Sequence, residues 1–216
     1  MSQPHLALYC APMACSLVPW LLLTEAGAVF ETRPVNLRKR EHLTPEFLRV
    51  NPKHRLPVLL IDGQALSKNV AIQLWIARQF PAAGLMPEEP LAFARATALL
   101  AWCASAIHPT LTPNALPERY CDLPDSADSV RRCAQRLLLE HLAIADEQLT
   151  GRDWFFEHFT SAHAYFFWCL RRARQFGVDA SALRHAMAHF ERMQQRPSVI
   201  ALQRLEADVM ARFAAA

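Results

Sequence analysis

Hydrophobic positions near the start of the chain change from a strand-like to a helix-like period. Residues 5–9 alternate in a way that predicts a short buried strand, and Pro12 ends it because proline cannot donate to a β-ladder. From Leu17 to Glu25 apolar residues recur at helical spacing, and Gly27 follows where a helix stop is expected. The pattern therefore predicts a strand that leads directly into a helix.

The same kind of pattern continues to residue 80. It predicts a strand, a short helix, two strands and a closing helix at residues 29–36, 45–50, 56–61, 64–67 and 69–80. Asp62-Gly63 lies between the two adjacent strands, and this dipeptide is the strongest short-range signal for a hairpin. The resulting order, β-α-β-α-β-β-α, is the thioredoxin-like arrangement, in which a cysteine at a helix start lies beside a proline that precedes a strand. Pro57 occupies that place, and a cis bond to Leu56 would expose the Leu56 backbone to an extended peptide.

The rest of the chain is predicted to be helical. Residues 81–90 are rich in Pro, Ala and Gly and show neither period, which indicates a linker. Helical periods follow at residues 91–107, 129–149, 160–176 and 183–195, with a last helix from residue 197, while four prolines break residues 108–124. We therefore expect an α/β thioredoxin-like N-terminal domain at 1–80, a linker at 81–90 and an all-α C-terminal domain at 91–216.

The composition of the chain mainly serves to exclude some classes of function. The chain has 52% hydrophobic residues and a net charge of +3 with scattered cations, which predicts a globular protein and argues against nucleic-acid binding. No secretory n-region and no long uninterrupted apolar run are seen, so we expect a soluble cytoplasmic protein that does not bind a membrane. The six cysteines lack zinc-type spacing, and His185 and His189 are interpreted as part of a solvated helix face, so no metal is expected.

Cys15 is the first candidate for chemistry. It and Ser16 are predicted to lie at the first turn of a helix, where free N–H groups and the helix dipole stabilise an anion and lower a thiol's pKa. The alternative is a small buried cysteine at a strand-helix junction, because free cysteine is among the most buried residue types.

Four motifs spread along the chain carry a family resemblance. They are residues 11–19 (APMACSLVP), residues 51–53 with 56–59 (NPK and LPVL), Trp102 with His108-Pro109, and residues 196–199 (RPSV). With these motifs the sequence resembles the cytosolic glutathione transferases, and within them the bacterial beta class. The resemblance implies the glutathione transferase fold, glutathione as co-substrate, a small hydrophobic electrophile as second substrate and a homodimer.

The resemblance also implies a glutathione site at the boundary of the two domains. Its catalytic residues would be Cys15, Ser16 and His108. Its glutathione-binding residues would be Arg40 near the glycyl carboxylate, Leu56 and Pro57 beside the cysteinyl part, Lys68 and Asn69 at the γ-glutamyl end, and Trp102. Trp102 and Ile107 are also candidates for lining the electrophile side, although a buried core role explains either one taken singly.

Two positions depart from the family pattern. Lys68 stands where the family generally has an acid that meets the γ-glutamyl ammonium, and two cations about 4 Å apart repel by roughly 1 kcal/mol even in water. Lys68 is alternatively a solvated surface lysine. His163 replaces the acid of a capping box that begins at Thr160, which predicts the loss of a helix cap worth about 1 kcal/mol.

Two functions follow from these residues. The first is an enzyme that conjugates glutathione to small electrophiles or exchanges thiols and disulfides through Cys15. The second is a non-catalytic homologue that acts as a binding or regulatory protein, with glutathione binding weakened by Lys68.

Overall fold

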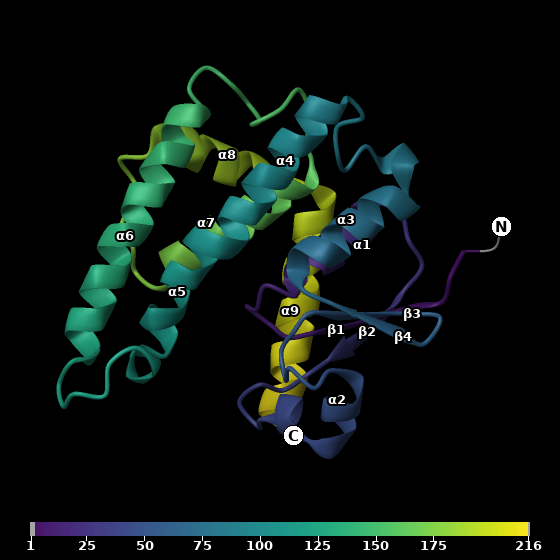
Figure 1. Cartoon of the computed structure of the whole chain (residues 1–216), viewed down its shortest axis with the longest axis horizontal. Helices are drawn as coiled ribbons and strands as arrows, with labels where there is room; N and C mark the ends of the chain where they lie inside the picture. The colour runs from purple at the N-terminus through teal and green to yellow at the C-terminus, as the bar shows by residue number, and fades with distance from the viewer. Residues whose placement is uncertain (1–2, 216) are drawn as a thin grey trace. The chain divides into compact units, whose positions relative to one another are not determined.

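The fold is described from a computed structural model that places residues 3–215. The chain divides into two compact units, Met1–Met86 with Gln195–Ala216, and Pro87–Gln194. The first unit holds the sheet and the second is helical, as can be followed in Figure 1. The predicted combination of an α/β thioredoxin-like part and a helical part is therefore confirmed.

The first unit is built on a mixed sheet in the order β2-β1-β3-β4. Its strands are β1 (Leu6–Cys10), β2 (Glu31–Pro34), β3 (Val58–Ile61) and β4 (Gln64–Ser67). β1 pairs with β2 in parallel and with β3 antiparallel, and β3 and β4 form the predicted hairpin. β1 is central, so its residues Leu6, Ala7 and Leu8 are almost fully buried.

Helices pack against this sheet and against one another. They are α1 (Leu17–Glu25), α2 (Pro45–Val50), α3 (Asn69–Gln79) and α9 (Pro197–Ala215). Leu21, Leu22 and Leu23 of α1 are all buried, because α1 packs against β1, α3 and α9. Each fully buried leucine contributes roughly 1.5–3 kcal/mol to folding.

The last helix is fixed to α1 by an ion pair that the sequence did not predict. Nε and Nη2 of Arg196 donate to the Glu25 carboxylate, at 2.8 and 2.7 Å, and the Ser198 hydroxyl donates to the same carboxylate. Burial alone would raise the pKa of Glu25, but the hydrogen bonds from Arg196 and Ser198 lower it below its usual value. α9 therefore belongs to the compact unit of the sheet, while the predicted domain boundaries at 1–80 and 91–216 stay a prediction.

The second unit consists of helices around a central one. They are α4 (Pro90–Trp102), α5 (His108–Ala115), α6 (Ala127–Gln148), α7 (Ser161–Gln175) and α8 (Arg184–Gln194). Residues 161–170 of α7 are buried without a break, which confirms the prediction of a central buried helix. The stretch Pro90–Ala115 is also long and apolar enough to cross a membrane, by length and composition only.

The predicted break at residue 108 is wrong in its first part. A π-helical turn at Cys103–Ile107 joins α4 to α5, and the His108 N–H bonds to the Cys103 carbonyl. The helix continues through Pro109 in its first turn, where a missing N–H costs little, also contains Pro113, and ends at Ala115, before Pro117.

The capping box at α7 is intact, which corrects the prediction that His163 abolishes it. The Thr160 nitrogen lies 2.8 Å from Nδ1 of His163, and the Phe155 nitrogen lies 2.9 Å from Nε2. A neutral imidazole carries one N–H and accepts at its other nitrogen, so it satisfies one of these two buried donors fully. The imidazole thus takes the place of the carboxylate.

His189 corrects the interpretation of a solvated helix face. Its side chain is fully buried and stacks on His163 at a centroid distance of 5.6 Å. Neither of its ring nitrogens has a hydrogen-bond partner among the residues that the structure describes. Burial, with a smaller effect of Arg192, lowers the pKa of His189 to about 3.

These two histidines should respond oppositely to the same substitution. His163→Leu leaves a buried backbone N–H without its acceptor, so we expect the free energy of unfolding to fall by about 1–3 kcal/mol. His189→Leu removes no hydrogen bond, so stability at pH 7.5 should be unchanged or higher. Thermal unfolding of both variants checks this. A larger loss in His189→Leu than in His163→Leu would contradict the assignment.

The low pKa of His189 also predicts a pH dependence. The unfolded chain binds a proton at this residue below the ordinary histidine pKa of 6.5 and the folded chain does not until about pH 3, so folding is weakened as pH falls from 6.5. The loss amounts to about 2 kcal/mol between pH 7.5 and pH 5. The stability advantage of His189→Leu over the wild type should therefore grow from pH 7.5 to pH 5. An advantage that stays constant would show that this ring does not resist protonation.

Candidate active site

Cys15 lies in the loop of residues 11–16, between the end of β1 and the start of α1. The Ser16 hydroxyl is fully buried and accepts a hydrogen bond from the Ala11 N–H at 3.0 Å. The Ala14 N–H bonds to the Ala11 carbonyl at 3.2 Å and closes a tight turn. Ser16 therefore shapes the loop, and Cys15 lies just before α1, as predicted.

Met13 in the same loop adopts a backbone conformation that is costly for a side chain. Its φ is +61°, and its N–H donates to the carboxylate of Glu206 at 2.7 Å. Glu206 lies on α9 and is only 4% exposed. A left-handed non-glycine residue costs roughly 1–3 kcal/mol, and a hydrogen bond to a buried carboxylate offsets part of this cost. Glu206 is thus a positioning residue that the sequence analysis missed.

Two further segments converge on Cys15. Its Sγ donates to the carbonyl of Leu56 at 3.8 Å, and the peptide bond between Leu56 and Pro57 is cis. The Asn69 amide donates to the Cys15 carbonyl at 2.9 Å and accepts from Gln73 at 2.9 Å. Asn69 is the first residue of α3, after its N-cap Lys68, so its side chain does not cap the helix and ties α3 to the loop.

The thiol of Cys15 is protonated at neutral pH. Burial raises its pKa to about 12, and hydrogen bonding by Asn69 and by its own backbone lowers it only in part. The expectation of a lowered pKa is therefore wrong, because desolvation outweighs the helix N-terminus here. A protonated thiol serves as a hydrogen-bond donor and is a poor nucleophile.

The two predicted cations of this unit are both exposed. Lys68 has a φ of +79°, and its side chain forms no hydrogen bond or ion pair with any residue that the structure describes. Arg40 also has a positive φ, +59°, and precedes a 3-10 turn at Glu41–Leu43. Their predicted contacts with glutathione stay predictions.

His108 in the helical unit is held by aromatic neighbours. Its Nδ1 lies 2.9 Å from the Tyr165 hydroxyl, and its ring meets Trp168 edge-on at 4.6 Å. Burial, and to a smaller extent Arg172, lowers the pKa of His108 to about 4. His108 is therefore neutral at pH 7, and its predicted catalytic role stays a prediction.

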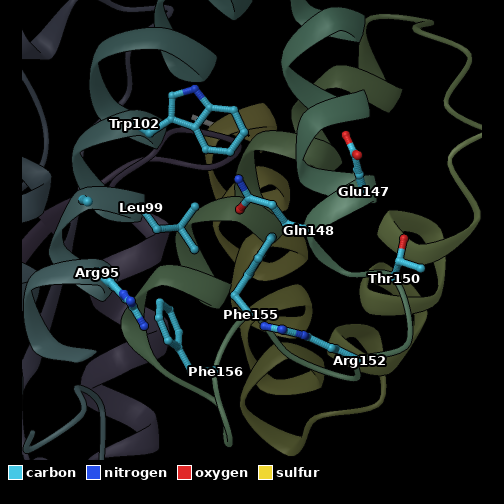
Figure 2. A pocket seen from close by; sticks show the side chains of 10 residues that line it. Arg95, Leu99, Trp102, Glu147, Gln148, Thr150, Arg152, Phe155 and Phe156 are labelled. Carbon is cyan, nitrogen blue, oxygen red and sulfur yellow. The ribbon is translucent and has the colours of Figure 1, made fainter. Parts of the chain in front are cut away.

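Trp102 lines a pocket of about 600 Å³ within the helical unit. Figure 2 shows Trp102 and Leu99 on α4, with Gln148 and Phe155 facing them and Arg95 and Arg152 near the lower end of the pocket in this view. The Trp102 ring also meets His141 edge-on. Ile107 is fully buried and belongs to the core.

Comparison with known proteins places this geometry in a family. The model of the glutathione S-transferase N-terminal domain matches residues 4–78. The glutathione S-transferase GstA of Escherichia coli O157:H7 is 31% identical over 196 residues, which are 89% of this chain and 94% of that protein. The chain belongs to the glutathione S-transferase family.

Solved structures of the family agree with this membership. A sphingomonad glutathione S-transferase complexed with glutathione is 34% identical, has a TM-score of 0.83 and is matched over 93% of this chain and 98% of that chain. A bacterial beta class glutathione S-transferase from Sphingomonas chungbukensis is also 34% identical, with a TM-score of 0.82 and the same shares covered. The predicted likeness to the beta class is confirmed.

The raised pKa of Cys15 predicts how fast it is alkylated. Because only the thiolate reacts, the rate of Cys15 modification by iodoacetamide should keep rising through pH 10 without a plateau. Mass spectrometry of the Cys15 peptide at short reaction times measures it, with the exposed Cys133 as the internal control. A plateau for Cys15 near pH 7 would refute the protonated thiol.

Proposed function

We propose that this protein conjugates glutathione to small electrophiles, with glutathione bound at the loop of residues 11–16. The observation that carries the proposal is the hydrogen bond between the Cys15 thiol and the Leu56 carbonyl, which lies just before the strand β3 that begins at Val58. An extended peptide such as glutathione can pair with a backbone segment of this kind, and the Cys15 thiol would then leave the Leu56 carbonyl. The glutathione complex of the sphingomonad relative supports the same ligand.

In this proposal Cys15 donates its S–H to the glutathione sulfur. Donation to an anion strengthens a hydrogen bond, so a protonated Cys15 stabilises the glutathione thiolate without ionising itself. Leu56 pairs through its backbone with the cysteinyl part, and Asn69 keeps the loop in place. Thiol exchange through Cys15 would need its thiolate, which burial disfavours. Conjugation is therefore the favoured reaction, and His108 and Trp102 are proposed as further contacts on the family resemblance.

Substitution of Cys15 tests whether its thiol contributes to conjugation or has only a structural role. Cys15→Ala removes the proposed donor, so turnover with a chlorinated aromatic acceptor should fall about tenfold or more, as one charged hydrogen bond is lost. Cys103→Ala, at a buried cysteine of the helical unit, is the control. Equal turnover in Cys15→Ala and the wild type would reject a role for Cys15 in catalysis.

Lys68 should set the affinity for glutathione. We expect calorimetry to show micromolar to low-millimolar binding by the wild type, and Lys68→Glu to bind about tenfold more tightly, because repulsion of the γ-glutamyl ammonium becomes attraction. Arg78→Glu makes the same charge change at an exposed site of α3 and should leave the affinity unchanged. No detectable binding by either the wild type or Lys68→Glu would favour a non-catalytic homologue.

We also propose that a second copy of the chain covers α4. In the apolar stretch Pro90–Ala115 only 28% of the most hydrophobic window is buried, and Leu91 and Phe93 are 56% and 42% exposed. A second copy of the chain packed on α4 would bury these apolar side chains. Light scattering should give twice the chain mass of 24.4 kDa.

A double substitution on α4 tests the proposed dimer. Leu91→Glu combined with Phe93→Glu should yield a monomer, whereas Leu123→Glu, at another exposed leucine, should not. A monomeric wild type, or one that binds lipid vesicles through α4, would contradict the proposal.

A further inference from the structure

The first unit contains a second cavity that no predicted site residue lines. It measures about 420 Å³, which lies in the usual range for small-molecule sites. Three segments enclose it: the loop after β1, the loop after β2 and the end of α9. Its lining residues include Pro12, Met13, Val35, Leu37, Met210 and Phe213. The cavity is thus apolar along most of its wall.

Part of this apolar wall is open to solvent. Leu37 is 40% exposed and Met210 is 47% exposed, although both are large hydrophobic side chains. Exposed apolar residues that gather in a concave site indicate a ligand with an apolar body.

The positive charge of the cavity wall is concentrated in one loop. Arg38 and Lys39 line it on the loop after β2, and none of its lining residues within the described part of the chain is acidic. The buried Asn36 accepts hydrogen bonds from the backbone N–H groups of both cations, each at 3.1 Å. The two cations therefore stem from a loop of defined shape, next to an apolar wall.

The cavity and the proposed thiol site lie on the same loop. Ala11, Pro12 and Met13 line the cavity, and Cys15 follows in the same loop. The loop conformation is fixed by hydrogen bonds from Met13 to Glu206 and from Ala11 to Ser16. A ligand in the cavity and a thiol at Cys15 would thus touch neighbouring residues of one short segment.

We propose that this cavity selects electrophiles that combine an apolar ring with an anionic group, and that Arg38 and Lys39 recognise the anion. The inference rests on the proposed conjugation and names its substrate class. The ring lies against Met13, Leu37 and Phe213, and the carboxylate or sulfonate faces the two cations. Arg38 and Lys39 determine specificity and do not take part in the chemical step.

The reaction on such a substrate is an aromatic substitution. The glutathione thiol gives its proton to solvent, and its sulfur lone pair forms a C–S bond at the ring carbon that carries chlorine. The C–Cl bond then breaks and chloride leaves with the bonding electrons. No oxidant or further co-reactant is needed.

The test compares a neutral and an anionic acceptor in the same variants. The acceptors are 1-chloro-2,4-dinitrobenzene and 4-chloro-3,5-dinitrobenzoate, each at saturating glutathione. Arg38→Gln combined with Lys39→Gln should raise KM for the benzoate about fivefold or more, because two exposed cations are lost, and leave KM for the neutral acceptor unchanged. Added salt should reproduce part of this effect in the wild type.

A matched variant controls for net charge. Arg49→Gln removes an exposed cation of α2 outside the cavity and should change neither KM. An equal rise of KM for both acceptors would overturn the inference. So would a rise of KM for glutathione itself, which would assign the two cations to the glycyl carboxylate of glutathione.

A binding measurement separates this inference from the proposed function. Calorimetry with unreactive 3,5-dinitrobenzoate and 3,5-dinitrobenzamide, without glutathione, should show tighter binding of the anion, lost in the double variant. Selective binding without turnover of either acceptor would reject the conjugation and leave the cavity assignment standing. Turnover of both acceptors with no preference for the anion in binding would reject the cavity assignment alone.

Discussion

The loop of residues 11–16 depends on one hydrogen bond within the loop and on two that come from distant parts of the chain. Glu206 on α9 accepts from Met13, Ser16 accepts from Ala11, and Asn69 on α3 donates to the Cys15 carbonyl. Each bond contributes only about 0.5–1.5 kcal/mol to stability. Together they stabilise one conformation of a short loop that belongs to no helix or strand. The position of the Cys15 thiol against Leu56 is a consequence of this network. Cys15 itself adds a single weak bond.

The same network explains why the thiol is protonated. The loop is held against α3 and the Leu56 backbone, so Cys15 is partly buried, and desolvation outweighs the favourable helix N-terminus. A more open loop would give a more acidic thiol and a less defined site. The structure therefore favours a cysteine that donates a hydrogen bond to a bound thiolate over one that attacks as a nucleophile. The apolar cavity beside the loop adds a place for the second substrate.

Much of the fold could be predicted from local pattern. The hairpin at Asp62-Gly63, the buried helix α7 and the strand after Pro57 all have strong short-range signals, and they are where the sequence places them. The helix through Pro109 was missed because a π-helical turn leaves no clear sequence pattern. The packing of α9 against α1 was missed because the ion pair between Arg196 and Glu25 joins residues far apart in the chain. Exposure of His189 was predicted wrongly, because a histidine on a helix has no signal that separates a solvated face from an aromatic core.

The sequence predicted which positions form the candidate site, but it did not predict the pKa of the Cys15 thiol. The motif residues predicted that Cys15, Leu56 and Asn69 belong together, whereas the pKa of the thiol depends mainly on burial, which no motif specifies. The most direct test is a crystal structure of the protein with S-hexylglutathione, a stable analogue of the product. The account predicts that the cysteinyl backbone of the ligand pairs with Leu56 and that its sulfur lies within hydrogen-bond reach of Cys15 Sγ. A ligand bound elsewhere, or a sulfur directed away from Cys15, would contradict the account.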